Sequence, residues 1–216
     1  MNGNSRGVGS RQDPWPQFLE PSAQCRHTPR VTQTSYTNHL LIAMPALTGS
    51  DFSHSVTLVC EHSDKGALGL VLNKPSPMML RDVLSQMKLE PRDEQIGAQA
   101  VLCGGPLRTD RGFVLHRPGG AWDSTHKVSE LIQITTSRDV LAAMARGEGP
   151  SDAYVALGFA RWDAGQLERE IRDNSWLPVP ADERLLFDLP FKKRWQASWQ
   201  FLGVDVEKLS LTAGNA

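Results

Sequence analysis

Residues 66–75 read GALGLVLNKP, and this stretch decides which class of fold the chain is expected to adopt. The short apolar run at residues 67–72 is typical of a buried strand. Residues 55–60, SVTLVC, precede it and alternate with β-branched side chains, which strands favour. Asp64 and Gly66 lie between the two runs and favour a turn. The two runs therefore predict a β-hairpin.

Further strands and helices extend outward from this hairpin. LLIAM at residues 40–44, closed by Pro45, predicts a buried strand where the folded domain starts. Ser76 and Pro77 form a typical N-cap pair, and apolar residues at helical spacing continue to Met87. Other strands are predicted at residues 100–103, 112–117, 131–135 and 154–159, and other helices at residues 137–145, 163–174 and 191–202. This alternation predicts a mixed β-sheet flanked by helices, in a layered α/β or α+β fold.

The composition argues against several classes of protein. The 216 residues include 23 Lys and Arg against 24 Asp and Glu, so no bulk charge favours a nucleic acid or an anionic membrane as partner. The apolar runs are far shorter than the roughly 18 residues needed to span a bilayer. Residues 1–16 lack the apolar core of a secretory signal. We therefore expect a cytoplasmic protein with no membrane span.

The sequence contains no motif for a metal or a cofactor. Its three cysteines, Cys25, Cys60 and Cys103, form no CxxC pair, which favours reduced thiols over a disulfide framework or a zinc site. GxGxxG and P-loop patterns are missing from the sequence, and no GxSxG elbow joins a predicted strand to a predicted helix. We therefore expect neither a metal nor a cofactor, and the sequence leans away from an enzyme.

The first 37 residues differ in composition from the rest of the chain. They are rich in Gly, Asn, Ser, Gln, Arg and Pro, and their apolar residues follow no sustained period. This pattern predicts a disordered N-terminal tail over residues 1–37. The folded domain is expected over residues 38–216, with room for a small inserted subdomain.

The domain carries a series of short segments whose joint order is more informative than any one of them. They are LIAMP (41–45), EH (61–62), GALGLVLNKP (66–75), GGP (104–106), RGFVLH (111–116), ITTS (134–137), LGFARW (157–162), QLE (166–168), NSWL (174–177), LLFD (185–188) and RW (194–195). In these segments the chain resembles the AlgH/YqgE family of bacterial proteins. The resemblance implies a mixed-sheet α/β core with barrel-like curvature, a cytosolic location and no established catalytic activity. One branch of that family is linked to transcriptional control of alginate synthesis.

Three positions depart from the pattern of the AlgH/YqgE family. Lys74 stands where we expect Arg, Phe159 where Tyr is usual, and Arg161 where Gly is usual. The first two changes are tolerable. Arg161 adds charge and bulk beside Trp162, so it would alter any groove at that point.

Cys103 is the first candidate for chemistry, because it precedes Gly104 and Gly105 at the end of a predicted strand. The glycine pair could expose backbone N–H groups as a small anion site and leave the thiol accessible for redox sensing or nucleophilic attack. The alternative is a tight Gly-Gly-Pro turn next to a small core residue. We prefer the alternative, because free cysteine is among the most buried residue types.

The histidines offer a second candidate. Cys60, Glu61 and His62 are adjacent, and together with His116 they suggest a Cys/His dyad or a metal site. Alternation along a strand would place Cys60 and His62 on one face and Glu61 on the other. Their spacing matches no metal motif, so we prefer structural roles.

Two segments that contain basic residues could bind anionic groups. Asn73 and Lys74 lead into a predicted helix N-terminus, which could hold a small anion or an acidic partner group, although loop geometry explains them as well. Residues 192–194 are basic and precede Trp195, a combination found in nucleic-acid binding. At helical spacing the basic side chains should mostly point to solvent and the tryptophan to the core, and we prefer that interpretation.

The leading hypothesis is a non-catalytic regulatory or adaptor module, a transcriptional regulator that acts through a protein partner. The alternatives are a redox sensor or enzyme that uses Cys103, and a regulator that binds DNA directly. The last is disfavoured, because the sequence has no helix-turn-helix signature. The sequence points to no particular partner and no oligomeric state. The residues assigned to the ligand or partner surface are Asn73, Lys74, Cys103, Gly104, Gly105, His116, Arg161 and Trp162.

Overall fold

The structure is a computed structural model, and it describes residues 35–204. The tail predicted for residues 1–37 therefore lies almost wholly outside the described residues. The strands are β1 (His39–Ala43), β2 (Val56–Ser63), β3 (Gly66–Val71), β4 (Pro75–Met79), β5 (Ala100–Cys103), β6 (Leu107–His116), β7 (Thr125–Lys127), β8 (Gln133–Thr135), β9 (Ala153–Asp163) and β10 (Trp176–Pro180). The helices are α1 (Leu80–Gln86), α2 (Glu94–Gly97), α3 (Arg138–Arg146), α4 (Gln166–Arg172) and α5 (Arg194–Phe201), with a π-helix, η2 (Arg184–Asp188), and a 3₁₀ turn, η3 (Phe191–Lys193).

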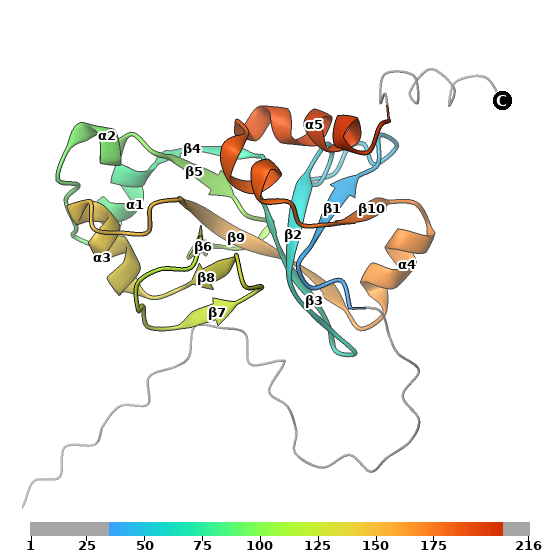
Figure 1. Cartoon of the computed structure of the whole chain (residues 1–216), viewed down its shortest axis with the longest axis horizontal. Helices are drawn as coiled ribbons and strands as arrows, with labels where there is room; N and C mark the ends of the chain where they lie inside the picture. Colours follow the sequence, from blue (N-terminus) through green and yellow to red (C-terminus); the bar gives the residue numbers. More distant parts are fainter. Residues whose placement is uncertain (1–34, 205–216) are drawn as a thin grey trace, which may run out of the picture.

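Strand β9 joins the two halves of a single mixed sheet. Its second half pairs with β3, which continues through β2 and β1 to β10. Its first half has β6 on one side, antiparallel, and β5 on the other, parallel. Figure 1 shows β9 running through the middle of the molecule between these two halves. The predicted mixed sheet is confirmed.

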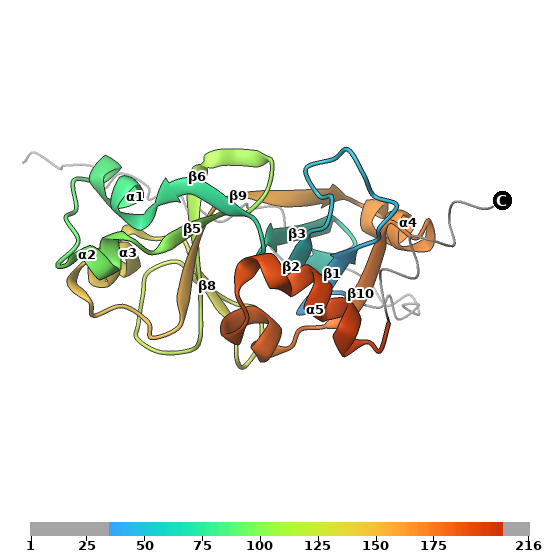
Figure 2. The same ribbon diagram turned by 90° about the horizontal axis from the view of Figure 1, so that it is seen from above.

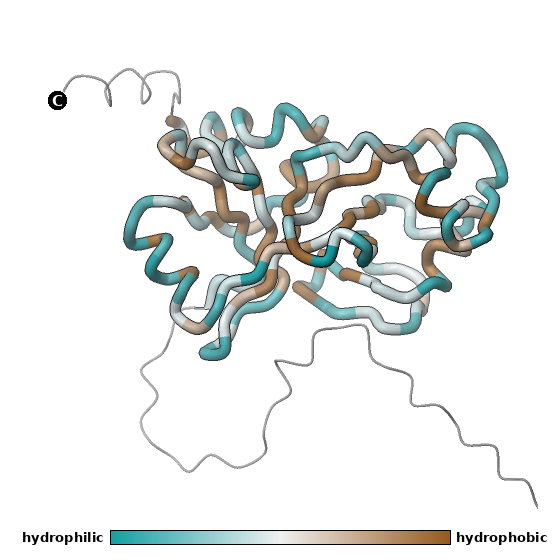
Figure 3. Tube along the Cα trace, turned by 180° about the vertical axis from the view of Figure 1, so that it is seen from behind, coloured by the Kyte–Doolittle hydropathy of each residue, from teal (hydrophilic) through white to brown (hydrophobic). Residues whose placement is uncertain are grey.

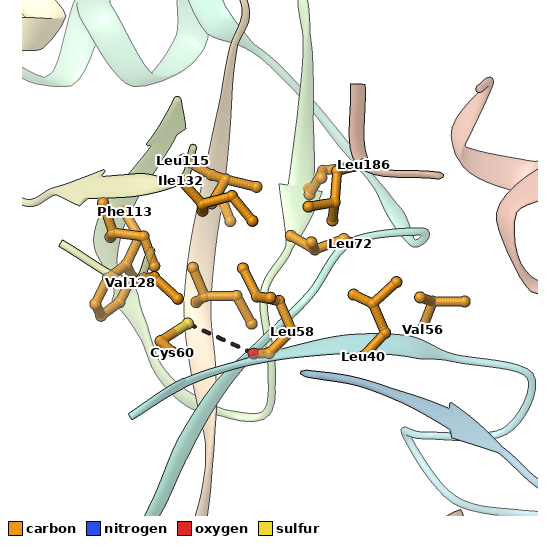
Figure 4. Close-up of a cluster of buried hydrophobic side chains, with 14 of the residues drawn as sticks. Leu40, Val56, Leu58, Cys60, Leu72, Phe113, Leu115, Val128, Ile132 and Leu186 are labelled. Carbon is orange, nitrogen blue, oxygen red and sulfur yellow. Dashed lines mark hydrogen bonds between the residues drawn. The ribbon is translucent and has the colours of Figure 1, made fainter. Parts of the chain in front are cut away.

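The sheet curls into a half-barrel around the largest apolar cluster. Side chains from β2, β6 and η2 point toward one another inside it, as Figure 4 shows for Leu58, Phe113 and Leu186. Hydrophobic residues follow the strands, while hydrophilic ones gather in the outer loops and on α4 (Figure 3). The barrel-like curvature that the family resemblance implied is therefore present.

Helices flank both halves of the sheet. The helices α1, α2 and α3 pack on the outer face of the β5–β9–β6 half, where Leu84, Val101 and Leu141 share an apolar cluster. Helix α4 covers the outer face of the other half through Leu167. Figure 2 shows α1–α3 at one end of the molecule and α4 at the other, with α5 beside β1 and β10. The layered arrangement of helices and sheet agrees with the sequence prediction.

The hairpin predicted from residues 55–72 is confirmed, but the helix start predicted after it is wrong. Strands β2 and β3 pair antiparallel through a turn that ends at Gly66. Ser76 does not cap a helix, because residues 75–79 form strand β4, which pairs with β5. The helix begins at Leu80, where the Asp82 carboxylate accepts a hydrogen bond from the Met79 N–H at 2.8 Å. The capping group is therefore an acidic residue in the first turn.

A β-bulge in β2 overturns the predicted alternation around Cys60. The pairing with β3 shifts register between Val59 and Glu61. As a result Cys60 lies in the central cluster, while His62 turns to the opposite face and contacts Glu168 of α4 at 3.2 Å. The expectation that Cys60 and His62 share a face is wrong, because the extra residue of a bulge reverses the alternation.

Candidate functional site

The structure divides the predicted site residues among three separate places. Lys74 and Cys103 come together where β4 pairs with β5, with Asn73 just before them. His116 lies at the end of β6, next to β8. The remaining pair, at residues 161–162, lies in the second half of β9 beside α4 and the β2–β3 hairpin. They do not form one site.

Asn73 has a structural role. Its side chain is buried, and its Oδ1 accepts a hydrogen bond from the Val56 N–H at 2.8 Å. Its Nδ2 donates to the carbonyl oxygen of His54 at 2.8 Å. Both ends of the amide are therefore used to fasten the loop before β2 to the end of β3. The preferred sequence interpretation, loop geometry, is consistent with these bonds.

Cys103 is exposed, so the preferred expectation of a buried core residue is wrong. Its backbone N–H donates to the carbonyl oxygen of Lys74 at 2.8 Å. Burial lowers the pKa of the Lys74 ammonium, and coulombic interactions with Asp51 and Cys103 oppose that shift. The Lys74 amine also donates to the backbone carbonyl of Asp51. A thiol and an amine therefore share one part of the surface.

The Gly-Gly-Pro segment is a crossing between strands and not the tight turn that we expected. Strands β5 and β6 lie on opposite sides of β9, so the segment passes over β9 to connect them. The Gly104 N–H donates to the Leu157 carbonyl at 2.7 Å, and a Cβ on Gly104 would lie 2.3 Å from the Gly158 oxygen. A Cβ on Gly105 would lie 2.2 Å from the Phe159 carbonyl carbon. Close backbone packing, rather than anion binding, explains this glycine pair.

His116 is fully buried and belongs to a hydrogen-bond chain inside the sheet. Its Nδ1 lies 2.7 Å from the Arg117 carbonyl oxygen and therefore carries the proton that is donated there. Its Nε2 lies 2.8 Å from the Thr135 hydroxyl, which in turn lies 2.7 Å from the Thr125 hydroxyl. Burial lowers the pKa of His116, while the bond to Arg117 opposes that shift. The neutral imidazole is therefore the stable form.

This burial predicts that the protein loses stability in mild acid through His116. Between the unfolded pKa of about 6.5 and the lower folded pKa, the unfolded chain binds the proton more readily, so the free energy of unfolding falls as pH falls. We expect His116→Gln to show a shallower decline below pH ~6.5 than the wild type. Urea unfolding at several pH values measures both slopes. The partly exposed His126 supplies the control His126→Gln, which leaves the His116 titration intact; equal slopes for wild type and His116→Gln would contradict the prediction.

In the third place, the side chains of Arg161 and Trp162 point to opposite sides of β9. Trp162 is buried under α4, and its Nε1 donates to the Glu170 carboxylate at 2.8 Å. Trp176 donates to the same oxygen at 2.8 Å. Arg161 points to the other side and lies 3.6 Å from Asp163. Trp162 is therefore a packing residue, and only Arg161 is exposed.

Sequence reasoning missed the burial of Arg194. We expected it to point to solvent with its basic neighbours, but its side chain is fully buried. Its guanidinium donates to the carbonyl oxygens of Leu72 at 2.8 Å and Leu189 at 3.1 Å. It also lies over the rings of Tyr154 and Phe191, 5.0 and 4.6 Å from their centres. This removes one cation from the basic stretch at residues 192–194 and weakens the nucleic-acid hypothesis.

Comparison with known proteins decides the family. The model of the AlgH-like family, DUF179, matches residues 40–207. This chain belongs to the AlgH-like family. An AlgH-like relative, the UPF0301 protein of Thioalkalivibrio sulfidiphilus, is 54% identical over 186 residues, covering 86% of this chain and 100% of the relative. A UPF0301 protein of Stenotrophomonas maltophilia is 49% identical and covers 86% of this chain and 98% of its own length.

Two solved structures agree with the fold. The solution structure of the AlgH protein from Pseudomonas aeruginosa matches with a TM-score of 0.70 and 42% identity, covering 89% of this chain and 98% of that one. A crystal structure of a protein from Corynebacterium diphtheriae matches with a TM-score of 0.61 at 21% identity, covering 78% of this chain and 87% of that one, which shows the fold alone. Within residues 35–204, no helix has the length and apolar character to cross a membrane.

Proposed function

We propose that this AlgH-like protein is a non-catalytic cytoplasmic regulatory module that acts through a protein partner. The observation that supports it best is the separation of Cys103 from His116. Cys103 pairs with Leu157 on one side of β9, while His116 pairs with Ala153 on the other. Strand geometry places them about 10 Å apart across the sheet and about 13 Å apart along it. A Cys/His dyad needs hydrogen-bond contact, which this separation forbids.

The exposed surface at Lys74 and Cys103 is the partner surface in this proposal. Its backbone is fixed, because β4 pairs with β5 and the Gly104 segment is bonded to β9. A rigid exposed surface loses little conformational entropy when it binds, which favours recognition. Arg161 lies about 13 Å or more along β9 and belongs to a different face. A transcriptional effect would then pass through the partner and not through DNA contacts.

Site-directed cross-linking from Cys103 tests this proposal. A photoactivatable cross-linker is attached to Cys103 in the full-length Cys25→Ser protein, which is then irradiated in a lysate of its own bacterium. We expect one protein to be captured from Cys103, and its yield to fall several-fold with Lys74→Glu but not with Arg161→Glu. The control carries the cross-linker in the β2–β3 turn, as Asp64→Cys with Cys103→Ser. The same set of proteins captured from both positions would contradict the proposal.

The exposure of Cys103 supports a second function, peroxide sensing. The thiolate would attack hydrogen peroxide, so that a sulfenate forms on sulfur and water leaves. The buried Cys60 is an internal control, because its thiol is fully buried and burial raises its pKa. Mass spectrometry after mild peroxide treatment should then find one added oxygen at Cys103 and none at Cys60. Oxidation of Cys103 no faster than that of a free cysteine peptide would count against a sensor.

A further inference from the structure

A surface cleft lies between helix α3 and strands β6 and β8, two strands across the sheet from Cys103, because Gly112 of the cleft and Cys103 both pair with Leu157 of β9. These elements lie together in the half of the molecule that carries α1–α3 (Figure 1). The cleft has a volume of about 230 Å³. Pockets for drug-sized ligands usually measure roughly 300–1,000 Å³. This cleft therefore suits a small metabolite.

The charged residues that line the cleft leave an excess of positive charge. Two guanidiniums, from Arg111 and Arg138, face one carboxylate, from Asp110. The Asp110 carboxylate already accepts two hydrogen bonds from Arg108, at 3.1 and 3.2 Å. The Arg138 Nη2 donates to the Met87 carbonyl at 2.9 Å, which fixes its guanidinium beside the cleft. Arginine pairs of this kind recognise carboxylates and phosphates.

The hydroxyl group of Thr136 points independently to a ligand. Thr136 lines the cleft, its backbone N–H donates to the Ser124 carbonyl oxygen at 3.3 Å, and its buried hydroxyl oxygen makes no hydrogen bond within residues 35–204. A buried hydroxyl without a partner is destabilising and calls for a specific explanation. An anion held by the two arginines would supply the acceptor that this hydroxyl lacks.

The N-terminus of α3 does not provide the anion site, although it adjoins the cleft. The Asp139 carboxylate already accepts hydrogen bonds from the backbone N–H groups of Val140 and Asp123, both at 2.8 Å. The cleft also has an apolar wall, formed in part by the buried side chains of Val114 and Leu141. A ligand that satisfies both parts of the lining carries a charge at one end and an apolar chain at the other.

We propose that this cleft binds a small organic anion, a carboxylate or a phosphate on a short apolar chain. The anionic group contacts Arg111 and Arg138 and accepts a hydrogen bond from Thr136. The chain packs against Val114 and Leu141. The probes and variants that test this site do not involve Lys74 or Cys103, so each proposal can fail without the other.

Titration calorimetry with four probes tests the proposal on the full-length protein. Hexanoate and hexyl phosphate carry both the charge and the chain, inorganic phosphate carries only the charge, and hexanol carries only the chain. We expect at least one of the first two to bind about tenfold more tightly than either of the last two. A preference between hexanoate and hexyl phosphate then distinguishes an organic acid from an alkyl phosphate. Failure of both to bind at about 10 mM, or equal binding of inorganic phosphate, would overturn the proposal.

Variants locate the bound probe. Arg138→Gln and Arg111→Gln should each weaken binding about tenfold, since each removes one charged contact. The control Arg146→Gln removes the same charge from the other end of α3, where Arg146 is exposed and pairs with Glu148 at 2.7 Å, and it should change affinity less than about twofold. Methyl NMR shifts at Val114 and Leu141 on titrating the wild type give a readout that needs no variant. Unshifted methyls, or equal loss with Arg146→Gln, would exclude the cleft.

Discussion

Replacing Arg194 with alanine is expected to lower the free energy of unfolding by about 3–5 kcal/mol. The guanidinium joins two distant segments, because it donates to Leu72 after β3 and to Leu189 after η2. Alanine would leave both buried carbonyl groups without that donor and would remove the cation from the faces of Tyr154 and Phe191. A loss of this size is a large fraction of the roughly 5–15 kcal/mol that stabilises a typical domain.

Two further variants separate the causes of that loss. Arg194→Met keeps most of the buried volume and removes the desolvated charge, so it should recover part of the stability. Burial lowers the pKa of Arg194 while Tyr154 opposes that shift, which shows that the charge is held at a cost. Lys193→Ala removes an exposed neighbouring cation and should change stability by less than about 0.5 kcal/mol. Urea unfolding followed by tryptophan fluorescence measures all three; a loss below about 1 kcal/mol for Arg194→Ala would show that its bonds are dispensable.

Local sequence pattern predicted the elements whose formation depends on nearby residues. The β2–β3 hairpin follows from two apolar runs and a turn that are adjacent in sequence. Helix α3 was predicted within one residue at each end, because Ser137 precedes it and Gly147, at φ +74°, ends it in the left-handed conformation. The strands β4, β7 and β10 were not predicted. Strand β10 pairs with β1, which is distant in sequence, and β7 is only three residues long, so the composition of each carries little signal.

The candidate sites depended on contacts that the sequence does not display. Arg194 belongs to a basic run in sequence, and its burial is decided by Leu72, 122 residues away. Cys103 follows two buried residues of β5, yet the crossing that begins at Gly104 leaves its side chain exposed. The cleft unites Arg111 of β6 with Thr136 and Arg138 near α3, and the pairing of β6 with β8 brings these together. A single Thr or Arg in a sequence gives no sign that it will line a cleft with residues from other strands and helices.

The crossing over β9 provides the second large expected effect, with Gly105→Ala destabilising the protein by about 3–5 kcal/mol. Gly105 has φ +156°, and a Cβ there would lie 2.2 Å from the Phe159 carbonyl carbon. The backbone of Phe159 and Ala160 cannot move easily, because β9 is held there by β3 on one side and β6 on the other. Gly119 is a matched control, since its φ of +154° is nearly the same and nothing lies within 4 Å of its Cβ position.

The comparison between these two glycines separates backbone strain from steric clash. Gly119→Ala carries only the cost of the unfavourable φ, about 1–3 kcal/mol, while Gly105→Ala carries that cost together with the overlap. Thermal and urea unfolding of both variants give the difference directly. Equal losses in the free energy of unfolding would mean that β9 shifts to accommodate the added methyl group, so that its contacts with Gly105 do not require glycine. A larger loss for Gly105→Ala would show that close packing against β9 requires glycine there, and that this packing holds the segment that follows Cys103 in place.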